Sequence, residues 1–165
     1  ADDYLAHEEV LADFITYFLE QEDLDYVYGD FLLVDKNGNR IGSWIYQPYT
    51  DDETVRKTFE RSGSGVYPMV GLYKLSFYRK HHYSWVVDPK NPYAGDALNS
   101  IVNIKRGWKR RYVHKPAYCY RRHQDNFTYN VAKRIPSIIY VIEYIINHFS
   151  EEIYLPNIKW STTLI

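Results

Sequence analysis

Residues 31–46 read Phe31-Leu32-Leu33-Val34-Asp35-Lys36-Asn37-Gly38-Asn39-Arg40-Ile41-Gly42-Ser43-Trp44-Ile45-Tyr46, and they carry the clearest structural signal in the sequence. Two apolar runs flank the polar segment 36–39. The Asn-Gly dipeptide in that segment supplies the positive φ angles that a tight turn between antiparallel strands requires. The stretch therefore predicts a β-hairpin with strands at 31–34 and 41–46.

Residues 3–20, which precede the hairpin, predict an amphipathic helix because apolar and polar side chains fall on opposite stripes at helical spacing. The acidic segment 21–23 ends this helix, and Asp2 or Asp3 can cap its N-terminus. The apolar stripe comprises Leu11, Phe14, Ile15 and Phe18. The polar stripe comprises Glu9, Asp13, Thr16 and Glu20.

The middle of the chain predicts one short helix and several strands. Thr50 and Glu53 have the spacing of a capping box, which starts a helix that runs to about Arg61. The segment Ser62-Gly63-Ser64-Gly65 ends that helix in a loop. From β-branched and aromatic composition we expect strands at 70–79, 83–87 and 101–104, and a basic hairpin or arm at 107–113.

Residues 137–149 predict a late helix, entered through Pro136 with Ser137 as its cap. Its polar positions share one stripe, so we expect the rest of its circumference to be buried, although Ile and Val also favour strands. Residues 157–165 predict a final strand. Together these elements indicate an α+β fold with a mainly antiparallel sheet and helices near both termini, in a single globular domain over residues 1–165.

The net charge of −1 conceals a separation of charge along the chain. Residues 1–62 carry a net charge of −10, residues 63–134 carry +11, and the near-neutral residues 135–165 carry −2. If the acidic and basic parts lie on different faces, copies attract one another head to tail or bind an acidic partner. The alternative is that the two parts neutralise each other within one monomer. The candidate acidic face comprises Glu9, Asp13, Glu20, Glu22 and Asp23.

Residues 105–122 form a basic and aromatic segment without a single acidic residue. This segment could be an arm that docks on the acidic first helix of a neighbouring subunit. It could bind nucleic acid, with cations on phosphates and rings stacked on unpaired bases, or it could be a solvated strand pair. The candidate binding residues are Lys105, Arg106, Trp108, Lys109, Arg110, Arg111, Tyr112, Lys115, Tyr118, Tyr120, Arg121 and Arg122.

Tyrosine is in excess, with 18 Tyr against 7 Phe. A tyrosine joins an apolar ring to a hydroxyl group, so it suits a contact surface that is wet in one state and dry in another. Tyrosine is also favoured in half-buried sheets. The excess therefore supports either a contact surface or a sheet rich in aromatic packing.

Enzymatic signals are weak in this sequence. The pair His81-His82, with later Asn and Asp residues, loosely resembles the ββα-metal nuclease arrangement, but the third ligand histidine of that arrangement is missing. Cys119, the only cysteine, excludes an internal disulfide and multi-cysteine zinc sites. We expect no cofactor, no bound metal and no enzymatic activity, and a metal-dependent nuclease at His81 or His82 is a remote alternative.

The start of the sequence, Ala1-Asp2-Asp3-Tyr4, lacks the basic and apolar regions of a signal peptide. The longest apolar stretch, 138–146, is interrupted by Glu143 and is shorter than the ~20 residues that a membrane span needs. We therefore expect an intracellular or virion-associated protein that has no membrane partner.

The predicted order of helix, hairpin, strands, late helix and final strand resembles that of small ring-forming subunits of phage tails and necks. The leading hypothesis is a non-enzymatic, self-assembling structural subunit, set in a phage or virus particle. Such a subunit would associate with its own copies or with other protein subunits through its acidic first half and its basic, Tyr/Arg-rich middle. The alternative hypothesis is a nucleic-acid-binding protein that uses residues 105–122.

Overall fold

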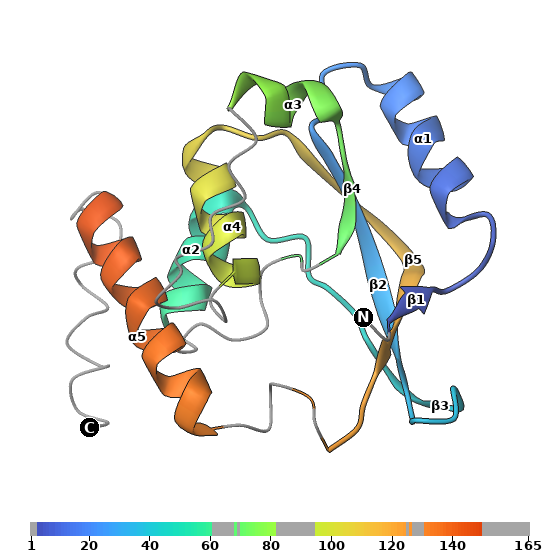
Figure 1. Cartoon of the computed structure of the whole chain (residues 1–165). Helices are drawn as coiled ribbons and strands as arrows, with labels where there is room; N and C mark the ends of the chain where they lie inside the picture. The colour runs from blue at the N-terminus through green and yellow to red at the C-terminus, as the bar shows by residue number, and fades with distance from the viewer. Residues whose placement is uncertain are drawn as a thin grey trace. The chain divides into compact units, whose positions relative to one another are not determined.

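A computed structural model describes residues 3–60, 68, 70–81, 95–124, 126 and 131–149, and these residues divide between two compact units (Figure 1). The first unit is Ala1–Pro48, Pro68–Ser84 and Arg106–Tyr129, and the second is Tyr49–Tyr67, Trp85–Lys105 and Asn130–Ile165. The first unit contains a five-stranded sheet, and the second contains helices. The predicted mixture of helices and sheet is confirmed, and the single domain stays a prediction.

The sheet of the first unit has the strand order β1-β5-β2-β3. The fifth strand, β4, also pairs with β2, along residues 26–28, whereas β3 pairs along residues 31–34. Its central pair is the parallel pair of β2 and β5, which aligns Tyr26 with Arg110 and Val34 with Arg121. The other three pairings are antiparallel, so the prediction of a mainly antiparallel sheet omitted its longest pairing. The strands are β1 (Tyr4–Leu5), β2 (Tyr26–Val34), β3 (Arg40–Trp44), β4 (Gly71–Tyr73) and β5 (Arg110–Arg121).

The parallel pairing of β2 and β5 is interrupted at Asp30. Gly29 faces Val113, whereas Asp30 faces Pro116, so two residues of β5 bulge out between these partners. A side chain at Gly29 has no room, because an ideal Cβ there would lie 2.5 Å from the carbonyl oxygen of Lys115. The close approach of the two strands therefore requires glycine at this position.

The turn between β2 and β3 covers residues 35–39 and is organised by the Asp35 carboxylate. Asp35 Oδ1 accepts hydrogen bonds from the backbone N–H groups of Asn37 and Asn39, at 2.8 and 2.9 Å. Gly38 has a φ of 88°, a conformation that glycine adopts without strain. Asn39 Nδ2 also donates to Asp35 Oδ2 at 3.0 Å, and this bond, followed by the backbone bonds, lowers the pKa of Asp35.

Helix α1 (Val10–Glu20) lies alongside the sheet and buries Val10 and Phe14 (Figure 1). The predicted start at residue 3 is wrong, because Tyr4 and Leu5 pair as β1 with β5. Asp3 does not cap the helix. Its Oδ1 accepts a hydrogen bond from the N–H of Arg121, at 2.9 Å. Of the predicted apolar stripe, Phe14 is buried, whereas Leu11 and Ile15 are exposed.

The strand predicted at 70–79 is wrong beyond residue 73. The strand β4 has only three residues, and helix α3 (Leu75–Lys80) follows it. The N–H of Phe77 donates to the carbonyl oxygen of Lys74, which forms the first turn of this helix. Aromatic residues favour strands in general, but here Phe77 is buried from a helix. The strand predicted at 83–87 lies outside the described residues.

The second unit contains three helices among its described residues, α2 (Asp51–Glu60), α4 (Gly95–Lys105) and α5 (Val131–His148). The capping box predicted for α2 is present, since Thr50 N–H donates to Glu53 Oε2 and Glu53 N–H donates to Thr50 Oγ1, at 2.9 and 3.2 Å. The helices share one apolar core. It comprises Val55, Phe59, Ala97, Leu98, Ile101, Val102, Val141 and Ile145.

Two predictions for the second unit are wrong. Residues 101–104 belong to helix α4, whose core positions recur at the helical spacing of four residues, as Ala97 and Ile101 show. The late helix begins at Val131, so Pro136 lies inside it and Ser137 is buried rather than a cap. It is also less buried than predicted. Its large exposed apolar side chains include Ile135, Ile139 and Ile146. The final strand predicted at 157–165 and the loop at 62–65 lie outside the described residues.

None of the helices in the described part of the chain combines the length and the apolar character that a membrane crossing requires.

Replacing Gly29 with alanine tests the close approach of β2 and β5. The added Cβ meets the Lys115 carbonyl, so we expect the free energy of unfolding to fall by about 1–3 kcal/mol. Urea denaturation followed by circular dichroism measures the change. Gly42→Ala is the matched control, since a Cβ there lies 3.4 Å from Leu33 Cδ1. Equal stability of the two variants would contradict the strand register.

Candidate interaction surface of β5 and the acidic segment

The predicted basic segment folds mainly as β5, and its aromatic rings do not all reach the surface. Trp108, immediately before β5, is buried against Tyr26, with 4.8 Å between ring centroids. Tyr118 is buried against Phe31, with 5.0 Å between centroids. Two of the rings predicted to stack on bases therefore pack inside the protein.

These two contacts belong to a continuous aromatic cluster on the sheet. Adjacent rings lie 4.1–6.0 Å apart, in stacked, tilted and edge-on arrangements. The cluster accounts for much of the tyrosine excess as internal packing, because ring pairs contribute beyond the area that they bury. Its members are Tyr26, Tyr28, Phe31, Trp44, Tyr46, Tyr73, Tyr78, Trp108, Tyr112, Tyr118 and Tyr120.

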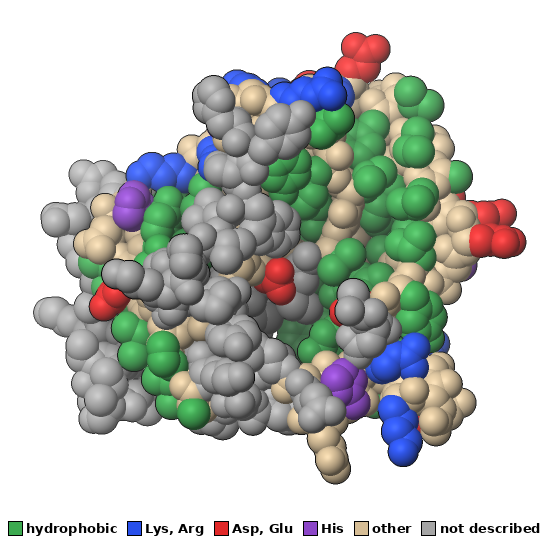
Figure 2. All heavy atoms as spheres, viewed as in Figure 1, with side chains coloured by type: hydrophobic (Ala, Val, Ile, Leu, Met, Phe, Trp, Pro, Cys, Tyr) green, Lys and Arg blue, Asp and Glu red, His purple; other side chains and the backbone are tan. Residues whose placement is uncertain are grey.

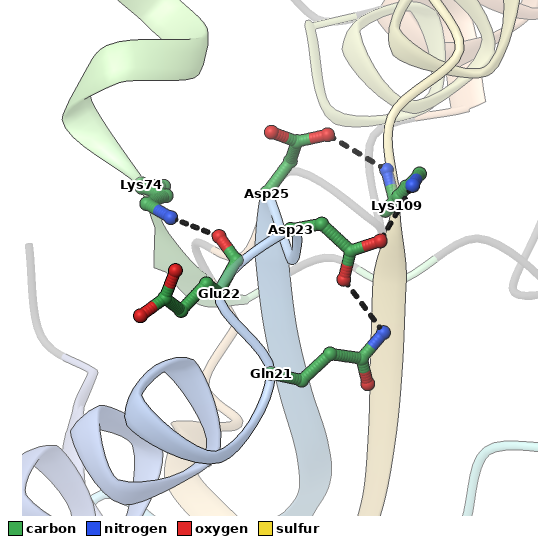
Figure 3. A network of polar contacts seen from close by, with 6 residues as sticks. All are labelled: Gln21, Glu22, Asp23, Asp25, Lys74 and Lys109. Atoms are coloured by element: carbon green, nitrogen blue, oxygen red, sulfur yellow. Dashed lines mark hydrogen bonds and ion pairs between the residues drawn. The ribbon is translucent and has the colours of Figure 1, made fainter.

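The acidic segment after α1 binds the start of β5 within the same chain (Figure 3). Lys109 Nζ lies 2.5 Å from Asp23 Oδ2, and the Lys109 N–H donates to Asp25 Oδ2 at 2.9 Å. Gln21 Nε2 donates to the other oxygen of Asp23 at 3.1 Å, and Lys74 Nζ donates to the Glu22 carbonyl oxygen. This network ties the end of α1, the start of β2 and the start of β5 together.

Two further ion pairs join α1 to β5. Arg111 Nη1 lies 3.3 Å from Glu20 Oε2, and its guanidinium stacks 4.4 Å from the Tyr17 ring centroid. Lys115 Nζ lies 3.4 Å from Asp13 Oδ2. Three residues of the predicted acidic face therefore bind three residues of the basic segment within one chain. The other two members, Glu9 and Glu22, are exposed.

Other predicted binding residues also contact their own chain. Arg121 Nη1 donates to the Lys36 carbonyl oxygen at 2.7 Å, and Arg110 lies 5.5 Å from the Trp108 ring centroid. Arg122 N–H donates to the Val34 carbonyl oxygen at 2.8 Å, at the end of the parallel pairing. Lys105 belongs to the second unit, where its Nζ donates to the His148 carbonyl oxygen at 2.7 Å. Arg106 is half-buried.

The sequence did not predict a polar cluster that is centred on Asp30. Asp30 is buried, and its Oδ1 accepts hydrogen bonds from the Tyr46 N–H at 2.9 Å and the Tyr112 O–H at 2.7 Å. His114 lies in the β5 bulge, with its Nδ1 3.3 Å from Asp30 Oδ2 and 2.8 Å from Tyr112 Oη. Burial, followed by the contact with Asp30, raises the pKa of Tyr112 well above its ordinary value. The sequence feature that could have indicated this cluster is the single carboxylate of Asp30 within an otherwise apolar strand.

The remaining enzymatic candidates show no catalytic arrangement among the described residues. His81 ends α3, where its ring lies 4.7 Å from that of Phe77, and His82 lies outside the described residues. Cys119 is buried on β5, opposite Tyr4. In the described part of the chain, no group of three or more His, Cys, Asp or Glu side chains is placed to hold a metal ion.

Comparison with protein-family models and with curated protein sequences finds no match to this chain. The proposed function therefore rests on the contacts and surfaces of this chain alone.

The ion pair between Lys109 and Asp23 sets the ionisation of that carboxyl. The hydrogen bond from Lys109, followed by that from Gln21, lowers the pKa of Asp23 below its ordinary 3.8. The pair therefore stabilises the fold above pH 3.8, and this contribution is lost as the pH falls through the lowered folded-state pKa. We expect Lys109→Met to raise the Asp23 pKa toward 3.8, as measured by carboxyl NMR titration.

Lys115→Met is the matched control for that titration, because Lys115 contacts Asp13 and not Asp23. It should leave the Asp23 pKa unchanged. An Asp23 pKa that does not respond to Lys109→Met would contradict the ion pair.

Proposed function

We propose that the chain is a non-enzymatic structural or interaction subunit that associates with its own copies or with other protein chains. The observation that carries this proposal is exposed apolar surface on the first unit. Figure 2 shows hydrophobic side chains gathered over α1, and β3 exposes more of them at the edge of the sheet. Large apolar groups that stay exposed next to one another are typical of association surfaces. These side chains are Leu11, Ile15 and Leu19 on α1, and Ile41, Trp44 and Ile45 on or next to β3.

The charged residues support association less directly. The pairs of Lys109, Arg111 and Lys115 with acidic residues of the same chain would have to open before these cations could bind a second copy. Exposed ion pairs contribute little to stability because solvent screens them, so exchanging one such pair for another gains little. Association between the acidic half of one copy and the basic half of another stays a prediction, and apolar contact is the stronger basis.

Nucleic-acid binding by residues 105–122 remains the alternative proposal. The exposed ammonium groups of Lys109 and Lys115 favour it, since exposed cations can exchange a carboxylate for a phosphate. The burial of Trp108 and Tyr118 disfavours it, because base stacking needs exposed rings. The setting in a phage or virus particle rests on the predicted element order alone and stays a prediction, as does the nuclease alternative.

The proposal predicts a defined oligomer in solution. Light scattering coupled to gel filtration, at low and high salt on protein freed of nucleic acid, measures its mass. We expect the oligomer to persist at high salt, because salt screens ion pairs but does not weaken apolar contact. Dissociation by salt would show that charged residues form the contact instead. A monomer at both salt concentrations would contradict the proposal. Nucleic-acid binding would then be the next hypothesis to test.

A further inference from the structure

The strand β3 lies at an edge of the sheet that the described residues form. Among the described residues it pairs only with β2, as the last strand on its side (Figure 1). An edge strand presents a row of backbone N–H and C=O groups that another strand can bind. Leu33 faces Gly42 but Val34 faces Arg40, so Ile41 bulges out of the ladder and only Gly42 to Trp44 pair with β2 in a regular register.

Edge strands that must stay unpaired usually carry charges or proline along their length. Here Arg40 is the only charged residue from 40 to 47, and the first proline is Pro48. Ile41 and Ile45 are 56% and 53% exposed, which is unfavourable for branched apolar side chains unless something covers them. The bulge at Ile41 and the length of five residues limit this edge, but its regular segment from Gly42 to Trp44 carries neither charge nor proline.

We propose that β3 pairs antiparallel with β3 of a second copy, around a two-fold axis that passes through Ser43. This inference rests on the proposed self-association and names its surface. In this register Ser43 faces Ser43 and Gly42 faces Trp44 of the second copy, and Ile45, just after β3, lies near the bulged Ile41 of the second copy. Residues that face one another in an antiparallel pair lie on the same side of the sheet, so each indole lies beside a glycine of the second copy.

Charge and backbone geometry favour a second copy in this register. The regular segment 42–44 and its neighbours Ile41 and Ile45 contain no charge, and the axis keeps each Arg40 away from the Arg40 of the second copy. The Asp30 carboxylate limits the segment, because it holds the Tyr46 N–H at 2.9 Å and draws the chain into the protein after Ile45. A two-fold contact of this kind uses the same residues from both copies.

The exposed stripe of α1 is less suited to a second copy of itself. Acidic residues flank it, and only some of them are paired within the chain. Packing α1 against α1 would bring these like charges together. The uncharged edge of β3 avoids that repulsion.

Ser43→Cys tests the register directly, because the axis places the two introduced thiols opposite each other, within disulfide distance. We expect mild oxidation to cross-link most of the protein as dimer on a non-reducing gel. The native Cys119 is buried and gives little background. Glu8→Cys, at an exposed site before α1, is the control and should cross-link only weakly. Equal cross-linking of both variants would overturn the register.

A second pair of variants measures the contact itself. Ile45→Lys places an ammonium group next to the paired segment, near Ile41 of the second copy, so the dimer dissociation constant should rise at least about tenfold. Leu19→Lys places the same charge on the 76% exposed position of α1 and should leave the dissociation constant unchanged. Circular dichroism establishes that both variants are folded.

The outcomes separate this inference from the proposed function. If the protein is oligomeric but responds to Leu19→Lys and not to Ile45→Lys, the β3 interface is wrong and self-association stands. If the unmodified protein is monomeric at every concentration and salt tested, both fail.

Discussion

The buried carboxylate of Asp30 is the constraint on which the first unit depends. A buried carboxylate must be hydrogen-bonded, because an unsatisfied one loses its hydration without compensation. Asp30 meets this requirement with the Tyr46 N–H, the Tyr112 O–H and the nearby His114. The two strands break register at this point, and the chain leaves the sheet edge after Ile45. One side chain thus links the central pairing to the exposed end of β3.

The charge separation along the sequence has a structural explanation within one chain. The acidic segment around α1 is adjacent to β5, and Asp13, Glu20 and Asp23 each bind a cation in that strand or immediately before it. These pairs position α1 against a parallel strand pair that no short turn connects. Part of the charge that predicts an external interaction surface in the sequence therefore pairs within the first unit, and the proposed contacts with other chains rest on exposed apolar side chains.

Local patterns in the sequence predicted local structure, but they did not predict which distant strands pair. The capping box of Thr50 and Glu53 could be read from three-residue spacing. The β2–β5 pairing joins distant segments, and parallel strands need no turn signal, so nothing marked Val113 or Cys119 as central strand positions. The strand predicted at 101–104 failed because a short apolar run fits a buried helix equally well. The Asp30 cluster depends on this same long-range pairing and was equally hidden.

The most direct test of self-association through the sheet edge is hydrogen–deuterium exchange measured at low and high protein concentration. Pairing with a second copy would hydrogen-bond the outward amides of β3, which are otherwise open to solvent. We predict that peptides covering residues 40–45 exchange more slowly at high concentration, while peptides from α1 exchange at an unchanged rate. Exchange in residues 40–45 that is independent of concentration, under conditions where the mass doubles, would contradict this account.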